Sequence, residues 1–468
     1  MVLPQEDEKN ITEAIIELSD AQINQVKYAR FTESQKRVFV LLLAIAAFQG
    51  PMASTAFLPA VQSIAEEFHT TGTMINSSNA VFCVAMAIAP CFFSPYIDFY
   101  GKKPIFFINS VLVAVCSLLV AVSQNLAMFW VFRIGMGFFG TCFVSLAGAC
   151  MPDIYPVERR GRALSWCLTG VLTGPGLAPV LGGIIITWSH WRVIFWVQTG
   201  LSCLVAIAFF IFFKETGYNL AFHEWQRESG KRFKLVVVNP FRVIVALRIS
   251  NLALIGYSSV ALMYNMFNLL TPIRYVVDPR FNLTSPVYGS LFYLAPGMGY
   301  LTATFFSGKW SDYILIRQKT KRNGKVMFED RLKAAIVPFA AVPPTILIYG
   351  WSLQKEKGGM ALPIVAMFLN GFSQTMAITS TNAYVIESYP PMGSRSISSN
   401  YFVRYLGTAV GTASALPAIN AIGVGWNSTI TAFVVIAGLL CVIFVAFRGE
   451  KSRLRWMEKH SASLEQPV

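Results

Sequence analysis

The sequence predicts an all-α integral membrane protein whose twelve transmembrane helices form two pseudo-symmetric bundles of six. Of its 468 residues, 54% are hydrophobic and only 13% are charged, whereas a soluble domain carries about 25% charged residues. Apolar stretches long enough to cross a bilayer recur from residue 38 to residue 447. A polar stretch from Lys214 to Lys234 divides these stretches into two sets. Two parallel halves of this kind are typical of membrane transporters.

Each predicted span is a run of about 20 mainly apolar residues, the length that crosses the hydrocarbon core. One of them contains Pro338, Pro343 and Pro344, which a transmembrane helix tolerates when neighbouring helices satisfy the freed carbonyls. The predicted spans are 38–58, 79–97, 104–122, 127–149, 164–186, 193–213, 250–271, 286–307, 334–351, 362–386, 397–420 and 429–447.

The distribution of lysine and arginine predicts the orientation of the chain. With the N-terminus in the cytoplasm, the inner segments hold 30 of these residues and the outer segments hold five. Because cytoplasmic loops are enriched in lysine and arginine, both termini are expected in the cytoplasm. The residues behind the formal net charge of +14 are therefore expected in the cytoplasmic segments, at the surface of the membrane. No nucleic-acid partner is expected.

The predicted domains follow from the spans. They are a cytoplasmic N-tail (1–36), an N-terminal six-helix bundle (37–213), a cytoplasmic linker (214–249), a C-terminal six-helix bundle (250–447) and a cytoplasmic C-tail (448–468). A weak repeat supports the two halves, since "SPYID" ends the second span at Asp98 and "GKWSD" ends the eighth at Asp312.

Several classes of function are not expected. The eight cysteines lie in apolar runs without a CxxC pair, so neither a disulfide framework nor a metal site is predicted. The spans contain no nucleophile–base pair or His/Asp cluster, which argues against an enzyme. No nucleotide-binding motif of the G-x-x-x-x-G-K-[ST] type occurs. We therefore expect no cofactor, and transport driven by a gradient, most simply of protons.

The short stretch "SPYIDFYGKKPIF" (Ser94–Phe106) places three charged side chains, Asp98, Lys102 and Lys103, between two uncharged runs. Gly101 permits a tight turn, and Lys102 and Lys103 hold the loop on the cytoplasmic side. Topology does not require Asp98. A carboxylate at the end of a span is better explained by a helix N-terminus or a nearby cation.

Asp98-x-x-Gly101-Lys102-Lys103 resembles the signature of the loop between spans two and three in the major facilitator superfamily, with Ser94 in place of a glycine. The resemblance implies that Asp98 caps a helix of the opposite half in the outward-facing state. The implied conformational latch consists of Asp98, Gly101, Lys102 and Lys103, with Asp153 and Arg160 or Arg162 as possible partners.

Spans four and five carry two further resemblances to this superfamily. Arg133 followed by Gly137 is similar to its Arg-x-x-x-Gly pattern, although an arginine so near a span end could also snorkel to the surface. "GVLTGPGLAPVLGG" resembles the antiporter signature, which implies an exporter; each glycine alone would indicate only close helix packing. The matching residues are Gly170, Gly174, Pro175, Pro179, Gly182 and Gly183.

Other stretches narrow the resemblance. "WRVIFWVQ" (Trp191–Gln198), "KTKRNGKVMFEDRL" and "ESYPPMGSRSISSNYFVRYLG" (Glu387–Gly407) are similar to fungal members of the twelve-span drug:proton antiporter family, in particular its quinidine-resistance-like branch. The resemblance covers roughly residues 37–447.

Polar or aromatic residues in the middle of spans are the candidates for substrate binding, because transporter sites lie near the bilayer midplane. Taken singly, a polar residue at such a position is more often a contact between helices than a contact to a ligand. Arg133 and Arg404 are expected to face the central cavity, where two cations would suit an anionic or polar substrate as readily as a drug. The candidates are Gln49, Arg133, Tyr264, Asn268, Tyr293, Asn370, Gln374, Asn400 and Arg404.

Proton coupling is less clear from the sequence, since spans one and seven lack any Asp or Glu in their interiors. The candidates for the proton-coupling residue are Asp98, Arg133 and Glu387.

The leading hypothesis is a proton-coupled exporter of small organic compounds or drugs that works by alternating access. An organic-anion or secondary-metabolite exporter is the alternative, and a non-transporting sensor is a remote one. The expected partners are a small-molecule substrate, protons and the lipid bilayer, with a monomeric chain in the plasma membrane or, alternatively, the vacuolar membrane.

Overall fold

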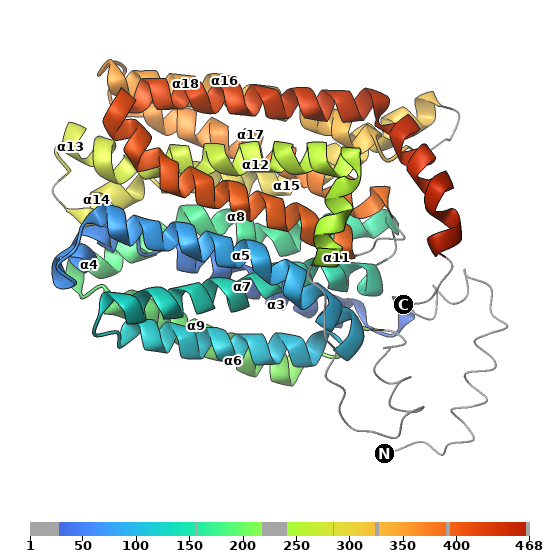
Figure 1. Ribbon diagram of the computed structural model, residues 1–468, viewed down its shortest axis with the longest axis horizontal. Coiled ribbons are helices and arrows are strands. Elements are labelled where there is room, and N and C mark those ends of the chain that lie inside the picture. Colours follow the sequence, from blue (N-terminus) through green and yellow to red (C-terminus); the bar gives the residue numbers. More distant parts are fainter. Residues whose placement is uncertain are drawn as a thin grey trace.

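The computed structural model describes residues 28–155, 157–217, 241–283, 285–322, 327–389 and 394–464. No β-strand occurs in these ranges. The helices run along one common direction and form an elongated bundle (Figure 1). The short helices α4, α13 and α14 lie at one end, called here the α4 end, and α11 lies at the other, the α11 end.

The first half of the chain forms six long helices. Side-chain caps fix three of their starts, since Thr32, Thr71 and Asn125 accept hydrogen bonds from the backbone N–H of Gln35, Met74 and Met128 respectively. The elements are α3 (Glu33–Thr55), η1 (Leu58–Ala60), α4 (Val61–Glu67), α5 (Gly72–Tyr100), α6 (Lys102–Ala121), α7 (Leu126–Ile154), α8 (Val157–Trp188) and α9 (Arg192–Phe212).

The second half repeats this plan with more interruptions. Its elements are α11 (Phe241–Ile244), η2 (Val245–Arg248), α12 (Ser250–Pro272), the π-helical turn η3 (Ile273–Val277), α13 (Asp278–Arg280), α14 (Pro286–Leu291), α15 (Leu294–Lys321), α16 (Asp330–Gln354), α17 (Ala361–Ser388) and α18 (Ser394–Leu464).

Glycine and proline mark two places where the helices differ from a simple span. Gly423 has φ 84° and ψ 165°, a conformation that favours glycine, and it separates α18 into two arms. These arms are the two predicted spans 397–420 and 429–447, and Figure 1 shows them turning back on each other. The predicted span 286–307 is interrupted between α14 and α15, because Pro296 has no N–H to donate to the carbonyl of Phe292.

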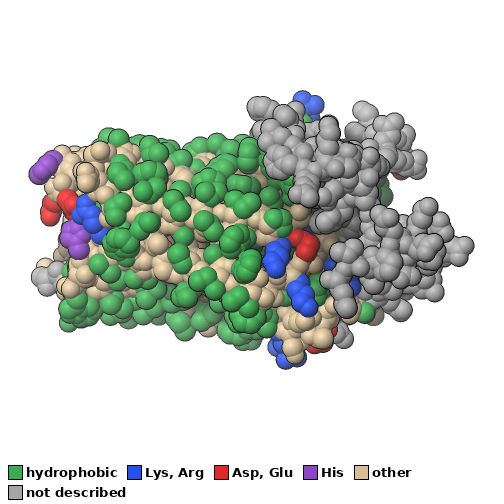
Figure 2. All heavy atoms as spheres, turned by 90° about the horizontal axis from the view of Figure 1, so that it is seen from below, with side chains coloured by type: hydrophobic (Ala, Val, Ile, Leu, Met, Phe, Trp, Pro, Cys, Tyr) green, Lys and Arg blue, Asp and Glu red, His purple; other side chains and the backbone are tan. Residues whose placement is uncertain are grey.

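The helices are apolar enough to cross a membrane. Nine segments of the described chain meet this criterion by length and hydropathy, and one of them covers both arms of α18. Helices α8 and α15 complete the predicted set of spans. On the face shown in Figure 2, hydrophobic side chains cover the middle of the molecule, and charged side chains gather toward its ends. This pattern is that of a multi-pass membrane protein.

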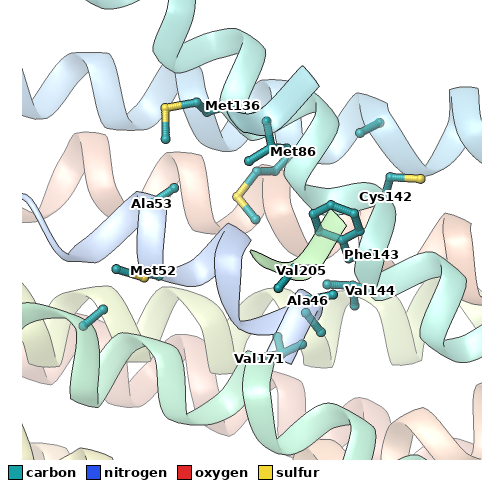
Figure 3. Packing of buried hydrophobic residues seen from close by; sticks show 14 of the residues in the cluster. Ala46, Met52, Ala53, Met86, Met136, Cys142, Phe143, Val144, Val171 and Val205 are labelled. Carbon is teal, nitrogen blue, oxygen red and sulfur yellow. The ribbon is translucent and has the colours of Figure 1, made fainter. Parts of the chain in front are cut away.

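Two clusters of buried hydrophobic side chains form the interior, one in each half. Figure 3 shows part of the first cluster, where Ala46, Met86, Phe143, Val171 and Val205 from five different helices meet. Three residues of α18, namely Tyr401, Tyr405 and Ala409, also join this first cluster. The halves are therefore in direct contact through α18, while the predicted domain boundaries remain a prediction.

Helix α8 approaches its neighbours closely through two rows of glycine. A Cβ atom at Gly170 or Gly182 would overlap a backbone carbonyl of α3 or of the residue after it. A Cβ at Gly176 would overlap Gly297 of α15, and one at Gly183 would overlap Ser290 of α14. One row thus packs within the first half, and the other forms the contact with the second half. These contacts explain the spacing of the glycines in "GVLTGPGLAPVLGG" by packing alone, and antiport stays a prediction.

The two kinds of glycine environment give a first test. Gly182→Ala is expected to cost about 1–3 kcal/mol of stability, because its methyl group has no room against Ala56. Gly200→Ala in α9 is the control, since nothing lies within 4 Å of a Cβ there. Thermal unfolding of the purified protein in detergent should show a lower midpoint for Gly182→Ala only. Equal midpoints for the two variants would contradict this packing.

Candidate functional site

Three small cavities lie along the contact between the two halves. The central cavity has a volume of about 40 Å³, the cavity toward the α4 end about 20 Å³ and the cavity toward the α11 end about 10 Å³. Because a single water molecule needs about 10–15 Å³ measured in this way, the central cavity has room for a few water molecules and not for an organic molecule. Among the described residues, the halves touch on both sides of the central cavity, so this part of the structure has a closed conformation.

The central cavity is lined by side chains from both halves. Most of the lining is apolar, and several of these side chains are the flexible thioethers of methionine, which adapt to irregular ligands. Arg404 is the only charged side chain among the described residues that line it. The lining residues are Pro51, Ser54, Cys83, Met86, Val171, Pro175, Met263, Met266, Phe267, Tyr300, Gln374, Thr375, Arg404, Tyr405 and Thr408.

Arg404 is held by aromatic rings rather than by a carboxylate. Its guanidinium carbon lies 4.2 Å from the ring centre of Tyr401 and 5.4 Å from that of Tyr405, which are favourable cation–π contacts. The side chain is only 3% exposed, and its Nε donates to no acceptor in the described structure. The cavity therefore carries a buried positive charge with unused hydrogen-bonding capacity.

A hydrogen-bond network behind the cavity positions Gln374. The Nδ2 of Asn265 donates to Oδ1 of Asn370 at 2.8 Å and to Oε1 of Gln374 at 3.0 Å. Asn370 donates in turn to the hydroxyl of Thr345 at 2.9 Å. Three helices, α12, α16 and α17, are joined in this way. In lipid, such bonds between helices are the main alternative to unsatisfied polar groups.

Of the predicted substrate-binding residues, Arg404 and Gln374 line the central cavity and Tyr293 lines the cavity at the α4 end. The others do not appear in either lining. Gln49 accepts a hydrogen bond from Ser202 of α9 at 2.6 Å, Asn268 accepts one from Asn427 at 2.8 Å, and Asn400 donates to Asn382 at 3.3 Å. Asn370 belongs to the network described above, and Tyr264 packs beside Gly411.

Arg133 is buried inside the first half, with 1% of its surface exposed. It does not snorkel to the membrane surface, which rules out that alternative. Its Nη2 donates to Oδ1 of Asn79 at 3.0 Å, and its guanidinium carbon lies 3.8 Å from the ring centre of Phe57. Arg133 itself lines neither the central cavity nor the cavity at the α4 end. Its partner Asn79 does line the cavity at the α4 end.

The predicted latch at the α11 end is organised around Glu215. Gly101 has φ 93° and makes the turn between α5 and α6, and the side chain of Lys102 pairs with Asp153. The carboxylate of Glu215 accepts hydrogen bonds from the backbone N–H of Lys102 at 3.1 Å and of Lys103 at 2.8 Å. Glu215 thus caps α6, where the helix dipole favours an anion.

The side chains of Asp98 and Arg162 lie outside the described part of the structure, so their predicted roles in the latch stay predictions. Sequence reasoning missed Glu215, because it follows the sixth span and lies more than a hundred residues from the helix that it caps.

The second half has its own cluster of charges at the α11 end, centred on Arg331. Its guanidinium donates to both carboxylate oxygens of Glu387 at 2.9 Å and to Asp312 at 2.6 Å. Asp312 is the residue that the sequence repeat pairs with Asp98. Glu387, a candidate for proton coupling, is therefore engaged in a two-pronged ion pair away from the central cavity.

Several lining residues were not predicted, including Tyr405, Thr408, Met263 and Tyr300. A signal existed for some of them. Tyr401, Arg404, Tyr405 and Thr408 follow the i, i+3, i+4, i+7 spacing of one helix face, so the position of Arg404 indicated its neighbours. No comparable signal marked the apolar residues, which look like any membrane-facing residue.

The ion pair of Glu387 gives a second test. Glu387→Gln should lower the thermal unfolding midpoint, because the buried Arg331 then keeps only Asp312 as an ionic partner. The number of protons exchanged per substrate in proteoliposomes should stay as in the wild type. A variant of unchanged stability whose transport no longer responds to a proton gradient would contradict this structural role.

Comparison with known proteins agrees with this architecture. The sequence pattern of the Major Facilitator Superfamily matches residues 43–412. The MFS-type transporter hepF of Aspergillus oryzae is 26% identical, with 91% of each chain covered. The efflux pump radE of Floropilus chiversii is 25% identical, with 88% of this chain and 80% of radE covered.

Among solved structures, the human organic anion transporter MFSD10 (TETRAN) superposes with a TM-score of 0.64 at 16% identity, covering 87% of this chain and 99% of that one. This likeness concerns the fold. The match of the family pattern to most of the chain, the apolar helices in two halves and the cavity between them lead to one conclusion. The chain belongs to the major facilitator superfamily and is a multi-pass membrane transporter.

Proposed function

We propose that this transporter exports small amphipathic organic compounds that carry an anionic group, by alternating access and at the expense of a proton gradient. The observation that carries the proposal is the charge of the central cavity. Among the described residues, Arg404 is buried there without a carboxylate partner, and the remaining lining is largely apolar.

A buried cation without a counter-charge is costly in a membrane protein. The cost is reduced when a substrate places an anionic group beside the guanidinium. The Nε–H group of Arg404, which has no acceptor among the described residues, can then donate a hydrogen bond to this anionic group. The methionine and phenylalanine side chains of the cavity suit an apolar body on the same molecule. A cation would instead meet repulsion from Arg404 and no described acid in the lining. Between the two hypotheses raised by the sequence, this geometry favours the organic-anion exporter.

The direction of transport follows from orientation and from relatives. The lysine and arginine distribution predicts that the α11 end faces the cytoplasm, so the α4 end would face the outside of the cell or, in the alternative location, the vacuolar lumen. Export as the direction is supported by the resemblance of α8 to the antiporter signature and by the name of radE as an efflux pump. We propose that the chain acts as a monomer, since each chain contains a complete cavity.

Proton coupling is the least constrained part of the proposal. No described acid lines the central cavity, Glu387 is ion-paired at the α11 end, and Arg133 is buried near the α4 end. Asp98 remains the sequence-based candidate. Coupling could therefore act through the contacts that close the two ends rather than through a carboxylate that binds substrate.

The proposal is tested with two dyes of similar size and opposite charge. In inside-out proteoliposomes with an acidic lumen, the wild type should concentrate the anion fluorescein and not the cation rhodamine 6G. Arg404→Met should abolish fluorescein transport, because it keeps the length of the side chain and removes its charge. Arg317→Met on the exposed part of α15 is the control and should transport normally.

Two outcomes would contradict the proposal. One is transport of rhodamine 6G in preference to fluorescein by the wild type. The other is full fluorescein transport by Arg404→Met at an equal amount of protein in the membrane. Fluorescein transport that does not respond to collapse of the proton gradient would overturn the coupling alone.

A further inference from the structure

The cavity at the α4 end is a second polar chamber next to the central one. Phe267 lines both cavities, and Thr408 and Thr412, one turn apart on α18, line the central cavity and the α4-end cavity respectively. The two chambers therefore follow each other along the contact between the halves. The lining of the α4-end cavity consists of Leu58, Val61, Asn76, Asn79, Phe267, Thr271, Arg274, Tyr275, Tyr293 and Thr412.

This chamber has buried hydrogen-bond donors without acceptors. Asn79 is fully buried, and its Oδ1 accepts from Arg133, but its Nδ2 has no acceptor in the described structure. Arg133 behind it also has two nitrogens, Nε and Nη1, without acceptors. A buried donor that stays unsatisfied costs about 1–3 kcal/mol. An excess of donors beside a buried guanidinium is the chemistry that holds a carboxylate or sulfonate.

The same chamber contains the contacts that close the α4 end. Arg274 donates through Nη1 to Asp278 at 2.7 Å within its own half, and through Nη2 to Oε1 of Gln62 at 3.0 Å in the other half. A second bond across the halves joins Nδ2 of Asn76 to the hydroxyl of Tyr275 at 2.8 Å. The acceptor of Arg274 in the opposite half is thus a neutral amide at the exposed edge of the chamber.

We propose that the α4-end cavity is a second binding station for the anionic group of the exported compound, and that its occupation releases Gln62 from Arg274 and so opens this end. The proposal rests on the proposed function, because it takes the same anionic substrate. The substrate anion would move past Phe267 from Arg404 to the donors of Asn79 and Arg274.

The competition at Arg274 follows from the strengths of the two kinds of bond. An anion adds to the hydrogen bond a Coulombic attraction, and often a second parallel bond, that the neutral amide of Gln62 does not offer to a guanidinium. An anion that reaches the chamber can therefore replace Gln62 as the partner of Nη2, while Asp278 keeps Nη1 in place. The bond that is lost is one of those that hold the halves together, and the displaced amide of Gln62 is exposed and finds water. Binding of the substrate anion in this cavity would then itself open the α4 end.

The first experiment removes the donor of Asn79. Fluorescein binding to the purified full chain is measured by fluorescence anisotropy, and its transport is measured in proteoliposomes. Asn79→Leu should leave the affinity unchanged, since that affinity belongs to the central cavity. Its kcat should fall by about tenfold or more, the effect of losing one hydrogen bond to a charged group.

Asn109→Leu is the control for this first experiment. Asn109 is equally buried in the first half but lines neither of the two cavities. It should keep the wild-type kcat. An unchanged kcat in Asn79→Leu, or an equal loss in both variants, would overturn the second station.

The second experiment follows the opening itself. Spin labels on Glu66→Cys and Lys357→Cys, both exposed at the α4 end but in opposite halves, report their separation in a Cys203→Ser background, which removes the exposed native thiol. Fluorescein should lengthen this separation in otherwise wild-type protein and not in Asn79→Leu. Gln62→Leu should lengthen it without any fluorescein, because the bond to Arg274 is gone.

The outcomes separate this inference from the proposed function. A wild type that neither binds nor transports fluorescein overturns the proposed anion export. The measurement on Gln62→Leu without fluorescein still tests the contact between Gln62 and Arg274. An unchanged separation in this variant overturns the role of that contact in closing the α4 end. Fluorescein transport with an unchanged separation in both the wild type and Gln62→Leu overturns this inference as a whole and leaves the proposed anion export standing.

Discussion

The structure depends on one constraint: the hydrocarbon core of a membrane offers no hydrogen bonds, so every polar group in the spans must find its partner inside the protein. Most of them do. Asn265 donates to Asn370 and Gln374 and so joins α12 to α17, and Asn268 and Asn427 join α12 to the second arm of α18. Several buried polar atoms of the described residues have no partner, and those beside the cavities bear on transport. Arg404, Arg133 and Asn79 each keep at least one buried donor free, and all three lie at or next to the cavities between the halves.

The contact between the halves consists of two different kinds of interaction. Along α8 it consists of glycine against glycine and serine, a surface that allows two helices to approach closely without any strong bond between them. At the α4 end it consists of two single hydrogen bonds from Arg274 and Asn76. At the α11 end, the charges are largely paired within each half, through Glu215 and Asp153 in one and through Arg331 in the other. Among the described contacts, those along α8 are close packing and those at the α4 end are single hydrogen bonds, so separation of the halves at the α4 end breaks no ion pair described there.

The fold could be predicted from the sequence because apolar length is a strong signal. Eleven of the twelve predicted spans each lie mainly in one helix or in one arm of α18, and the span 286–307 is divided between α14 and α15. The prolines of α16 did not interrupt that helix. The interruption between α14 and α15 could have been read from Pro296. The domain boundaries, the identity of the proton site and the role of Asp98 remain predictions.

The site was predicted less well, for a physical reason. Hydropathy gives the depth of a residue in the membrane but not the helix face on which it lies. Gln49 and Gln374 are both amides in the middle of a span, yet Gln49 bonds to α9 and Gln374 reaches the cavity. Charge was a partial guide, since Arg133 and Arg404 were both expected to face the central cavity and only Arg404 lines it. Contacts that join distant parts of the chain, such as Glu215 with the start of α6, leave no mark in a single sequence.

The central claim is that the guanidinium of Arg404 binds the anionic group of the substrate. Proton–nitrogen NMR of protein with labelled arginine side chains tests it most directly, with the signal of Arg404 assigned by its absence in Arg404→Met. The account predicts that fluorescein shifts the Nε–H signal of Arg404 in proportion to the fraction bound. A signal that stays unchanged while fluorescein is bound would contradict the account.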